Sequence, residues 1–580
     1  MTEQPEASPD LTIDGGFLRR AYWILSLGLV GLLAHAFVPL EEFLHRGDDA
    51  YYYFKVAVNY PTHGFWTFDG IHATNGVQPL WCLILTALAQ IMHWIGIRDV
   101  DVMSRVFVFL TAAIHFASCM VLLRIVRRAV SLPAGIAAAG AFLFPLGIVW
   151  TRVWGMENSL YALVLLLTVS YYQQHFRTGC TRRQAASLGA LLGLTCLARL
   201  NAGFLIPVLL ATYLIASRRD GSLGRRLRDC LVIGGVASAI ILPYLAYNLA
   251  TTGHPLPVSG GAKLIQSAQF LAENGVETVW SLPFLELLNE WTREARRWFL
   301  TSRGMDGTWL IGGRLFLVDS TSYSTFGAFV VVLLLGPVLL GKPRVWLAEL
   351  RHSSRCLAPF SYLAVFALLN VVVSLLWFPY EATYALKRWG LLEAEIVITT
   401  CVAVLTATNL CFVGSRLIPK KAHTPVATGA LLLIVALSTQ KTLTHYWDGK
   451  VQYSDWNRST NDARFRGCIT LRKKVPKGSV IGSWNAGVLG FYSGYPVVNL
   501  DGLINSWEFL PYLERRDMAG YIRDQGIQYL ADTRYEFSAR AGKGLIKKLD
   551  MERVSRQNMD PDGTGLAYKN QEFLIFKVGR

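Results

Sequence analysis

The stretch Arg46-Gly-Asp-Asp-Ala-Tyr-Tyr-Tyr-Phe-Lys55 directly follows the first long apolar run of the chain, residues 21–40. It sets two adjacent carboxylates and three tyrosines at the end of a segment long enough to cross a bilayer. Tyrosine is enriched at the boundary between lipid and water, so the stretch is typical of an outer loop of a membrane protein. Asp is also a favoured N-terminal cap. Asp48 and Asp49 therefore equally suit the start of a helix over Tyr51–Tyr60.

The composition of the whole chain agrees with a membrane protein. Of 580 residues, 52% are hydrophobic and only 17% are charged, against about 25% charged residues in average soluble domains. This excludes a purely soluble multidomain enzyme, and the high apolar content excludes a disordered chain. Twelve apolar runs could span a bilayer, at about 21–40, 79–97, 103–123, 132–150, 158–175, 184–200, 201–217, 229–250, 322–341, 357–378, 390–411 and 424–440.

The positions of Lys and Arg decide the orientation of these runs, because short cytoplasmic loops collect basic residues. Twelve spans would place Arg124 and the cluster Arg218–Arg228 outside, whereas omitting 79–97 moves both inside. We interpret 79–97 as a juxtamembrane helix on the outer face, which leaves about eleven transmembrane helices and a cytoplasmic N-terminal tail over 1–20. Twenty basic residues then lie on the predicted cytoplasmic side and exceed the net charge of +16, so nucleic acid is not needed as a partner.

This topology divides the rest of the chain into two domains. Residues 21–441 form the transmembrane domain, with outer loops at 41–102 and 251–321, and residues 442–580 form a soluble tail outside. The tail alternates short apolar runs with helix-like stretches such as Tyr512–Asp524, which predicts a periplasmic α/β domain. No Cys/His cluster has the spacing of a zinc site. Strands are expected near 479–483, 496–500, 527–530 and 573–576.

Polar residues gather on the predicted outer face. The loop Trp66–Trp81 is polar and rich in glycine, and such a loop at membrane depth is tolerated where it is buried in protein or lines a cavity. Glu157 lies at the mouth of the span 158–175, where ionisable residues are usually functional. An ordinary connecting loop and a helix cap are the plainer readings of these two features. Four cations also lie on the predicted outer side, namely Arg199, Lys263, Lys387 and Arg388. They suit either binding of an anionic lipid phosphate or snorkelling of their side chains to the lipid headgroups.

Several of these motifs together resemble the GT-C glycosyltransferases, a superfamily that includes protein O-mannosyltransferases and the aminoarabinose transferase that modifies lipid A. The membrane domain carries Asp48-Asp-Ala-Tyr51, the loop Asp69-Gly…Thr-Asn-Gly…Pro-Leu-Trp81 and Gly155-Met-Glu157. The tail carries Gly482-Ser-Trp-Asn-Ala-Gly487 and Val498-Asn-Leu-Asp-Gly502, which resemble the soluble domain of many bacterial members.

The resemblance implies a polyprenyl-phosphate-linked sugar donor and a glycan, lipid or protein acceptor, at the outer side of a bacterial inner membrane. Asp48 would be the general base that takes the acceptor proton, with Asp49 and Glu157 assisting and with inversion at the sugar. A divalent metal, bound by some members, would use the same three carboxylates. Arg199, Lys263 and Arg388 would bind the donor phosphate. The residues expected to line the cavity or contact the acceptor are Tyr52, His72, Asn75, Gln78, His254, Asn499 and Asp501.

Two other functions fit a polytopic chain with these outer polar residues. One is a transporter or lipid flippase, although transporters often show internal repeats and interrupted helices, and no repeat is evident here. The other is a non-catalytic assembly protein whose tail binds envelope glycan. Convergence of Asp48, Glu157 and Arg199 on one outward site favours the transferase, whereas a polar path across the membrane favours transport.

Overall fold

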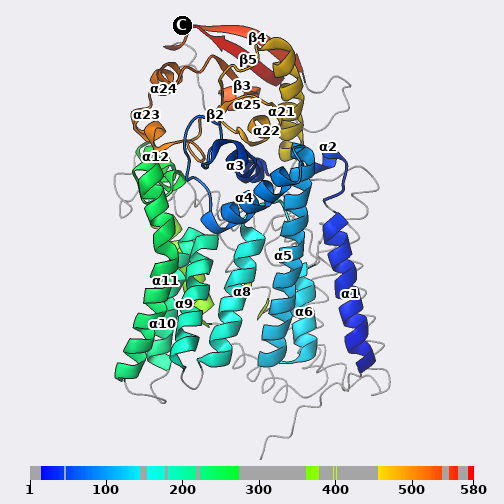
Figure 1. Ribbon diagram of the computed structural model, residues 1–580, viewed down its shortest axis with the longest axis vertical. Coiled ribbons are helices and arrows are strands. Elements are labelled where there is room, and N and C mark those ends of the chain that lie inside the picture. Colours follow the sequence, from blue (N-terminus) through cyan, green and yellow to red (C-terminus); the bar gives the residue numbers. More distant parts are fainter. Residues whose placement is uncertain are drawn as a thin grey trace, which may run out of the picture.

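Helices form one end of the molecule and a small α/β region forms the other (Figure 1). The computed structural model describes residues 15–34, 36–44, 47–143, 153–176, 180–216, 223–273, 361–377, 396–397, 400–401, 455–538, 548–558 and 572–579.

Eight of the predicted spans coincide with helices, which together we call the bundle. Two of these helices, α5 (Val100–Ala129) and α11 (Leu223–Thr252), are long and apolar enough to cross a membrane by length and composition. The predicted runs 322–341 and 424–440, and most of 390–411, lie outside the described residues, and the predicted number of eleven spans is not confirmed. The helices are α1 (Gly15–Ala34), α5 (Val100–Ala129), α6 (Leu132–Leu143), α8 (Asn158–His175), α9 (Arg182–Ala198), α10 (Leu205–Ala216), α11 (Leu223–Thr252) and α17 (Ser361–Trp377).

Two shorter helices, α3 (Asp48–His63) and α4 (Pro79–Trp94), lie between the bundle and the tail (Figure 1). A short helix, α2 (Leu40–Phe43), precedes them. Helix α3 ends at Gly64, whose φ of 76° favours glycine. Helix α4 has 16 residues and is thus about 24 Å long, less than the roughly 30 Å of a bilayer core. Its exposed Leu83, Ile91 and Trp94 suit the juxtamembrane position predicted for it.

The tail contains a five-stranded sheet of order β2-β1-β3-β5-β4. Strands β2, β1 and β3 are parallel, whereas β5 pairs antiparallel with both β3 and β4. All four predicted strands are present; β4 was not predicted, because its exposed residues are mostly polar. The strands are β1 (Ile481–Ser483), β2 (Val497–Asn499), β3 (Tyr529–Thr533), β4 (Met551–Asn558) and β5 (Glu572–Val578).

The helix expected over Tyr512–Asp524 is interrupted. The structure has α23 (Leu510–Glu514) and α24 (Met518–Asp524), separated at Arg516, whose φ of 56° lies in the left-handed region. A 3-10 turn, η6 (Trp507–Phe509), precedes α23. The side chain of Asp517 then caps α24 by accepting the Gly520 N–H group. The apolar spacing of this stretch therefore predicted helix correctly and missed the break.

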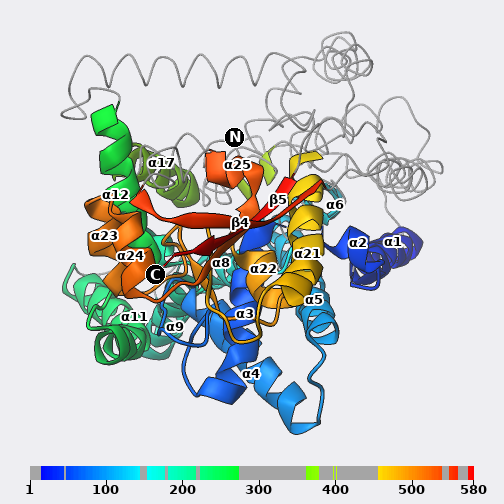
Figure 2. The same cartoon turned by 90° about the horizontal axis from the view of Figure 1, so that it is seen from above.

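Alternating side chains divide the sheet between two hydrophobic cores. Ala531 and Ile575 belong to the core shared with the bundle, whereas Leu530 and Leu574 belong to a second core. Helices α21 (Asp455–Lys474) and α22 (Gly487–Tyr492) cover the first face of the sheet (Figure 2). Helices α23, α24 and α12 (Val258–Glu273) cover the second.

Helix α12 therefore supplies part of the tail's core although it comes from the predicted outer loop 251–321. Its Val258 and Ala262 are fully buried in the second core. Its Gln266 side chain donates to the Asp501 carbonyl at 2.9 Å. The predicted boundary near residue 442 stays a prediction, and the contacts of α12 tie the two predicted domains together.

Candidate active site

Helix α3 presents carboxylates and tyrosines on two different faces. Residues four apart share a face of a helix, so Asp48 pairs with Tyr52 and Asp49 with Tyr53. The first pair meets the tail and Tyr53 meets the bundle. We name the two groups the tail cluster (Asp48, Tyr52, Arg464, Asn499, Asp501, Asp532) and the bundle cluster (Tyr53, Gln78, Glu157, Asn158, Arg199).

The bundle cluster joins α3 to the first residues of α8 and the last residues of α9. The Tyr53 hydroxyl accepts the Gln78 N–H group at 3.2 Å and lies close to the Glu157 carboxylate, whose charge acts on it. The Gln78 side-chain oxygen accepts the Leu200 N–H group at 3.0 Å. Arg199, beside Leu200, donates to the Asn158 side-chain oxygen at 3.4 Å. Three residues singled out from the sequence, Gln78, Glu157 and Arg199, thus lie in one cluster.

Glu157 is the unusual member of this cluster. Its side chain is buried, with 5% of the residue exposed, and its Oε2 atom has no hydrogen-bond partner among the described residues. Buried polar groups are normally paired, and an unpaired buried charge is costly. A buried carboxylate oxygen in this state is suited to accept a hydrogen bond from a ligand.

Tyr53 is fitted to hold this carboxylate. Burial, with the nearby Glu157 charge, raises the pKa of Tyr53 well above its usual value. The phenol therefore remains protonated at physiological pH and keeps its single O–H donor. Since the Tyr53 oxygen already accepts the Gln78 N–H group, its O–H group is the donor that faces Glu157.

Asp48 lies in the tail cluster and binds backbone. Its two carboxylate oxygens accept the Gly487 and Val488 N–H groups, each at 2.8 Å, at the start of α22. Burial raises the pKa of Asp48, and the Arg464 charge and the two N–H groups oppose that rise. A Cβ atom on Gly487 would stand 2.2 Å from the Asp48 carbonyl oxygen, so only glycine fits there. Asp48 thus fastens the tail to α3.

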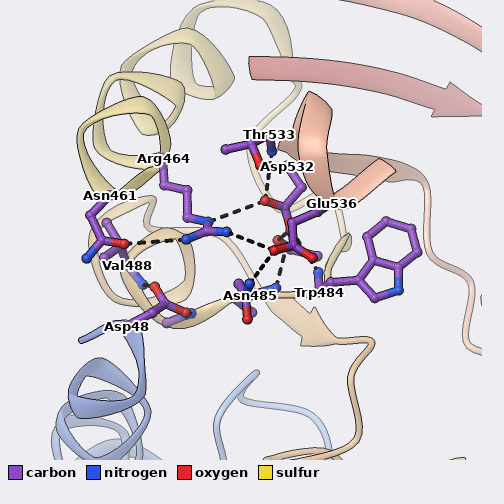
Figure 3. Close-up of polar contacts among 12 residues, drawn as sticks. Asp48, Asn461, Arg464, Trp484, Asn485, Val488, Asp532, Thr533 and Glu536 are labelled. Atoms are coloured by element: carbon purple, nitrogen blue, oxygen red, sulfur yellow. Dashed lines mark hydrogen bonds and ion pairs between the residues drawn. The ribbon is translucent and has the colours of Figure 1, made fainter. Parts of the chain in front are cut away.

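Arg464 is the buried cation of the tail cluster (Figure 3). Its Nε atom lies 3.3 Å from Asp532 Oδ1, and its Nη2 atom lies 3.7 Å from Glu536 Oε1. Asp532 also accepts the Ser483 hydroxyl at 2.9 Å. Sequence reasoning missed this group because its members are far apart in the chain. A cation between the apolar residues Ala463 and Phe465 was the available signal.

The Tyr52 hydroxyl joins two of the predicted acceptor residues. It accepts from the Asn499 side chain and donates to the Asp501 carboxylate, both at 3.3 Å. It also accepts the Ala486 N–H group at 3.3 Å. Tyr52, Asn499 and Asp501 are all buried. The structure therefore brings these three predicted residues together inside the contact between α3 and the tail.

The outer loop between α3 and α4 is also fastened to its surroundings. His72 lies 2.7 Å from Asp69 Oδ2 and 2.8 Å from the Gln525 side-chain oxygen, so it links the loop to the tail. Hydrogen bonding to Asp69 raises the pKa of His72. Asn75 is fully buried and accepts the Val258 N–H group at 2.8 Å. Both predicted cavity residues thus hold segments together.

His254, Lys263 and Asp49 are the other predicted residues that the structure describes. His254 stacks on Trp507 with ring centroids 3.9 Å apart. Lys263 is partly buried on α12, and Asp49 is partly buried on α3. Arg388, like Lys387, lies outside the described residues. Within the described ranges, no group of three or more His, Cys, Asp or Glu side chains is arranged to hold a metal. A metal at Asp48, Asp49 and Glu157 stays a prediction.

Comparison with known proteins bears on the fold. The chain is similar to the oligosaccharyltransferase of Archaeoglobus fulgidus in the apo form, at 11% identity and a TM-score of 0.50, over 90% of this chain and 70% of that one. It is also similar to ArnT from Cupriavidus metallidurans bound to undecaprenyl phosphate, at 12% identity and a TM-score of 0.47, over 97% of each chain.

Residues 456–567 match a family described as Domain of unknown function (DUF8728). No curated protein matches the sequence. The similarity to the archaeal structure shows that the chain has the GT-C fold, as the motifs around Asp48 and Glu157 predicted.

Proposed function

We propose that this chain is a membrane glycosyltransferase that moves a sugar from a polyprenyl-phosphate donor to an acceptor on the outer side of the membrane. The observation that carries the proposal is the buried Glu157 carboxylate, whose Oε2 atom is unpaired among the residues that the structure describes. An acid and a cation within one polar cluster are the two groups that this reaction requires. The GT-C fold supports the same reaction class.

We propose Glu157 as the general base. Its Oε2 atom is unpaired among the described residues, whereas both oxygens of Asp48 already accept backbone N–H groups. The assignment of the base to Asp48 stays a prediction, which a transfer assay of the Asp48→Asn variant tests. By helical spacing, Asp49 lies on the face of α3 that carries Tyr53. We propose it as the carboxylate that assists the base.

The reaction follows from these positions. The acceptor oxygen attacks the anomeric carbon as its proton passes to Glu157. The bond between the anomeric carbon and the phosphate oxygen breaks, and the electron pair leaves with the polyprenyl phosphate. Arg199 stabilises the charge that grows on this phosphate. Attack from the face opposite the leaving group inverts the anomeric centre.

The placement of the chain in the cell follows from the same proposal. The exposed apolar side chains of α1 and α11, such as Trp23 and Leu231, suit contact with lipid. We propose a multi-pass protein of a bacterial inner membrane, with a cytoplasmic N-terminus and the tail in the periplasm. Glu157 and Arg199 lie in one cluster at one end of the bundle, whereas Asp48 lies in the tail cluster. The shared position of the acid and the cation supports a transferase over a transporter or flippase.

A transfer assay tests the proposal directly. Purified protein is incubated with a panel of polyprenyl-phosphate sugars and with envelope glycans, lipids and proteins as the source of acceptor, and released polyprenyl phosphate is followed over time. We expect release by the wild type and a loss of about 100-fold or more in Glu157→Gln, the range typical of a general base. Absence of release with every donor in the panel would contradict the proposal, as would full activity in the Glu157→Gln variant.

A further inference from the structure

A chain of hydrogen bonds crosses the bundle cluster and passes through one loop residue. Gln78 is the last residue before α4 and contributes from both its backbone and its side chain. Its N–H group donates to the Tyr53 hydroxyl at 3.2 Å, and its side-chain oxygen accepts the Leu200 N–H group at 3.0 Å. One residue thus touches the groups that neighbour both Glu157 and Arg199.

The Tyr53 end of this series of hydrogen bonds lies beside Glu157. Oε2 of Glu157 is without a partner in the described part of the protein, and the Tyr53 hydroxyl lies close to the same carboxylate. Tyr53 is buried and sits in the rigid helix α3. A buried phenol with a single O–H donor beside a carboxylate limits the orientations that this carboxylate can adopt.

The Leu200 end of this series of hydrogen bonds holds the backbone next to Arg199. Helix α9 ends at Ala198, and Arg199 adopts extended backbone before the short 3-10 helix η1 (Leu200–Phe204). The Leu200 N–H group lies at the start of η1, where N–H groups lack partners within the helix. Gln78 supplies that partner and so holds the backbone that carries Arg199.

We propose that Tyr53 and Gln78 are positioning residues for the transfer reaction: Tyr53 orients the Glu157 carboxylate, and Gln78 sets the distance between Glu157 and Arg199. This inference rests on the proposed function. It gives Gln78 a different role from the cavity-lining one expected from the sequence. Catalytic groups need such support because small displacements of a reacting group lower the rate strongly.

The two residues are distinguished by steady-state kinetics of polyprenyl-phosphate release. In Tyr53→Phe we expect kcat to fall about 10- to 100-fold, with the donor KM within about twofold of wild type, because only the base is misplaced. In Gln78→Met we expect the donor KM to rise about three- to tenfold as well, because Arg199 loses its support. Tyr60→Phe, two turns farther along α3, is the matched control and should match wild type.

A double-mutant cycle separates positioning from a general loss of structure. If Tyr53 acts through Glu157, adding Tyr53→Phe to Glu157→Gln should cost less than about twofold further. Additive losses, or a kcat in Tyr53→Phe within twofold of wild type, would overturn the positioning role while wild-type transfer upholds the proposed function. Absence of wild-type transfer with every donor would overturn both. A thermal unfolding midpoint within about 2 °C of wild type shows that the variants are folded.

Discussion

The carboxylates on the two sides of α3 are in opposite states. On the tail side, Asp48 and Tyr52 have their polar atoms bonded to α22, Asn499 and Asp501. On the bundle side, Tyr53 is bonded but Glu157 keeps one buried oxygen without a partner in the residues described. A carboxylate that already holds backbone N–H groups stabilises a contact. One that lacks a donor in a buried position is set up for a ligand.

This difference separates two roles, a structural one and a proposed catalytic one, whose residues are neighbours in the sequence. Asp48 and Asp49 are neighbours in the chain, yet α3 turns them toward different surroundings. The tail side fixes how the soluble region sits on the bundle. The bundle side carries the groups that the proposed chemistry needs. Each prediction below tests the role of residues on one side of α3.

The largest expected effect is on activity, in Glu157→Gln. The amide keeps the size of the side chain but cannot take a proton, so we expect transfer to fall by about 100- to 10,000-fold. The thermal unfolding midpoint should stay within about 2 °C of wild type, because one buried charge is also removed. Paired assays of released polyprenyl phosphate and thermal unfolding measure both quantities.

The next effect is on stability, in Arg464→Met. Removing the cation leaves Asp532 and Glu536 buried without their ion-pair partner. We expect a loss of about 3–5 kcal/mol in unfolding free energy. Limited proteolysis of the tail and denaturant unfolding report it. An unchanged protease pattern would contradict the structural role of the tail cluster. Arg534→Met, which breaks only an exposed pair with Glu572, is the matched control.

A smaller effect of mixed kind is expected in Asp48→Asn. The amide places an N–H donor against one of the two N–H groups of α22, which should cost about 1–3 kcal/mol. Transfer activity should stay within about tenfold of wild type, as expected for a change acting through the tail. A loss as large as that of Glu157→Gln at unchanged stability would reverse our assignment and make Asp48 the base.

The smallest effect concerns pH and His72. Hydrogen bonding to Asp69, with the nearby Glu508 charge, raises the folded-state pKa of His72, and burial opposes it. A raised pKa stabilises the fold below the unfolded value of about 6.5. That contribution is lost as pH rises through the folded value. We expect the midpoint of wild type to fall between pH 6 and 8 by a degree or two more than that of His72→Gln. Equal pH dependence in both proteins would contradict it.

Local pattern was enough to predict much of the fold. The apolar run 158–175 coincides with α8, because helical spans are set by continuous apolar length. Four strands of the tail followed from short apolar runs between turn residues. Strand β4 did not, because its side chains are largely exposed and polar. The break at Arg516 depends on one backbone angle that composition does not encode.

The site was predictable in its charged members but not in their bonding. Glu157 and Arg199 stood out because an acid and a cation are rare beside apolar spans. Arg464 and Asp532 did not, because an ion pair across the tail exists only after the chain folds. The choice between Asp48 and Glu157 likewise depends on which carboxylate meets the N–H groups of α22.

The burial of α12 in the tail's second core has a consequence for synthesis. Ala262 leaves the ribosome long before Leu530 and Leu574, the strand residues of the core that it joins. Until those residues arrive, the apolar side of α12 has no sheet to cover it. The tail therefore closes around a helix made much earlier, and non-local closures of this kind slow folding and leave apolar surface exposed meanwhile.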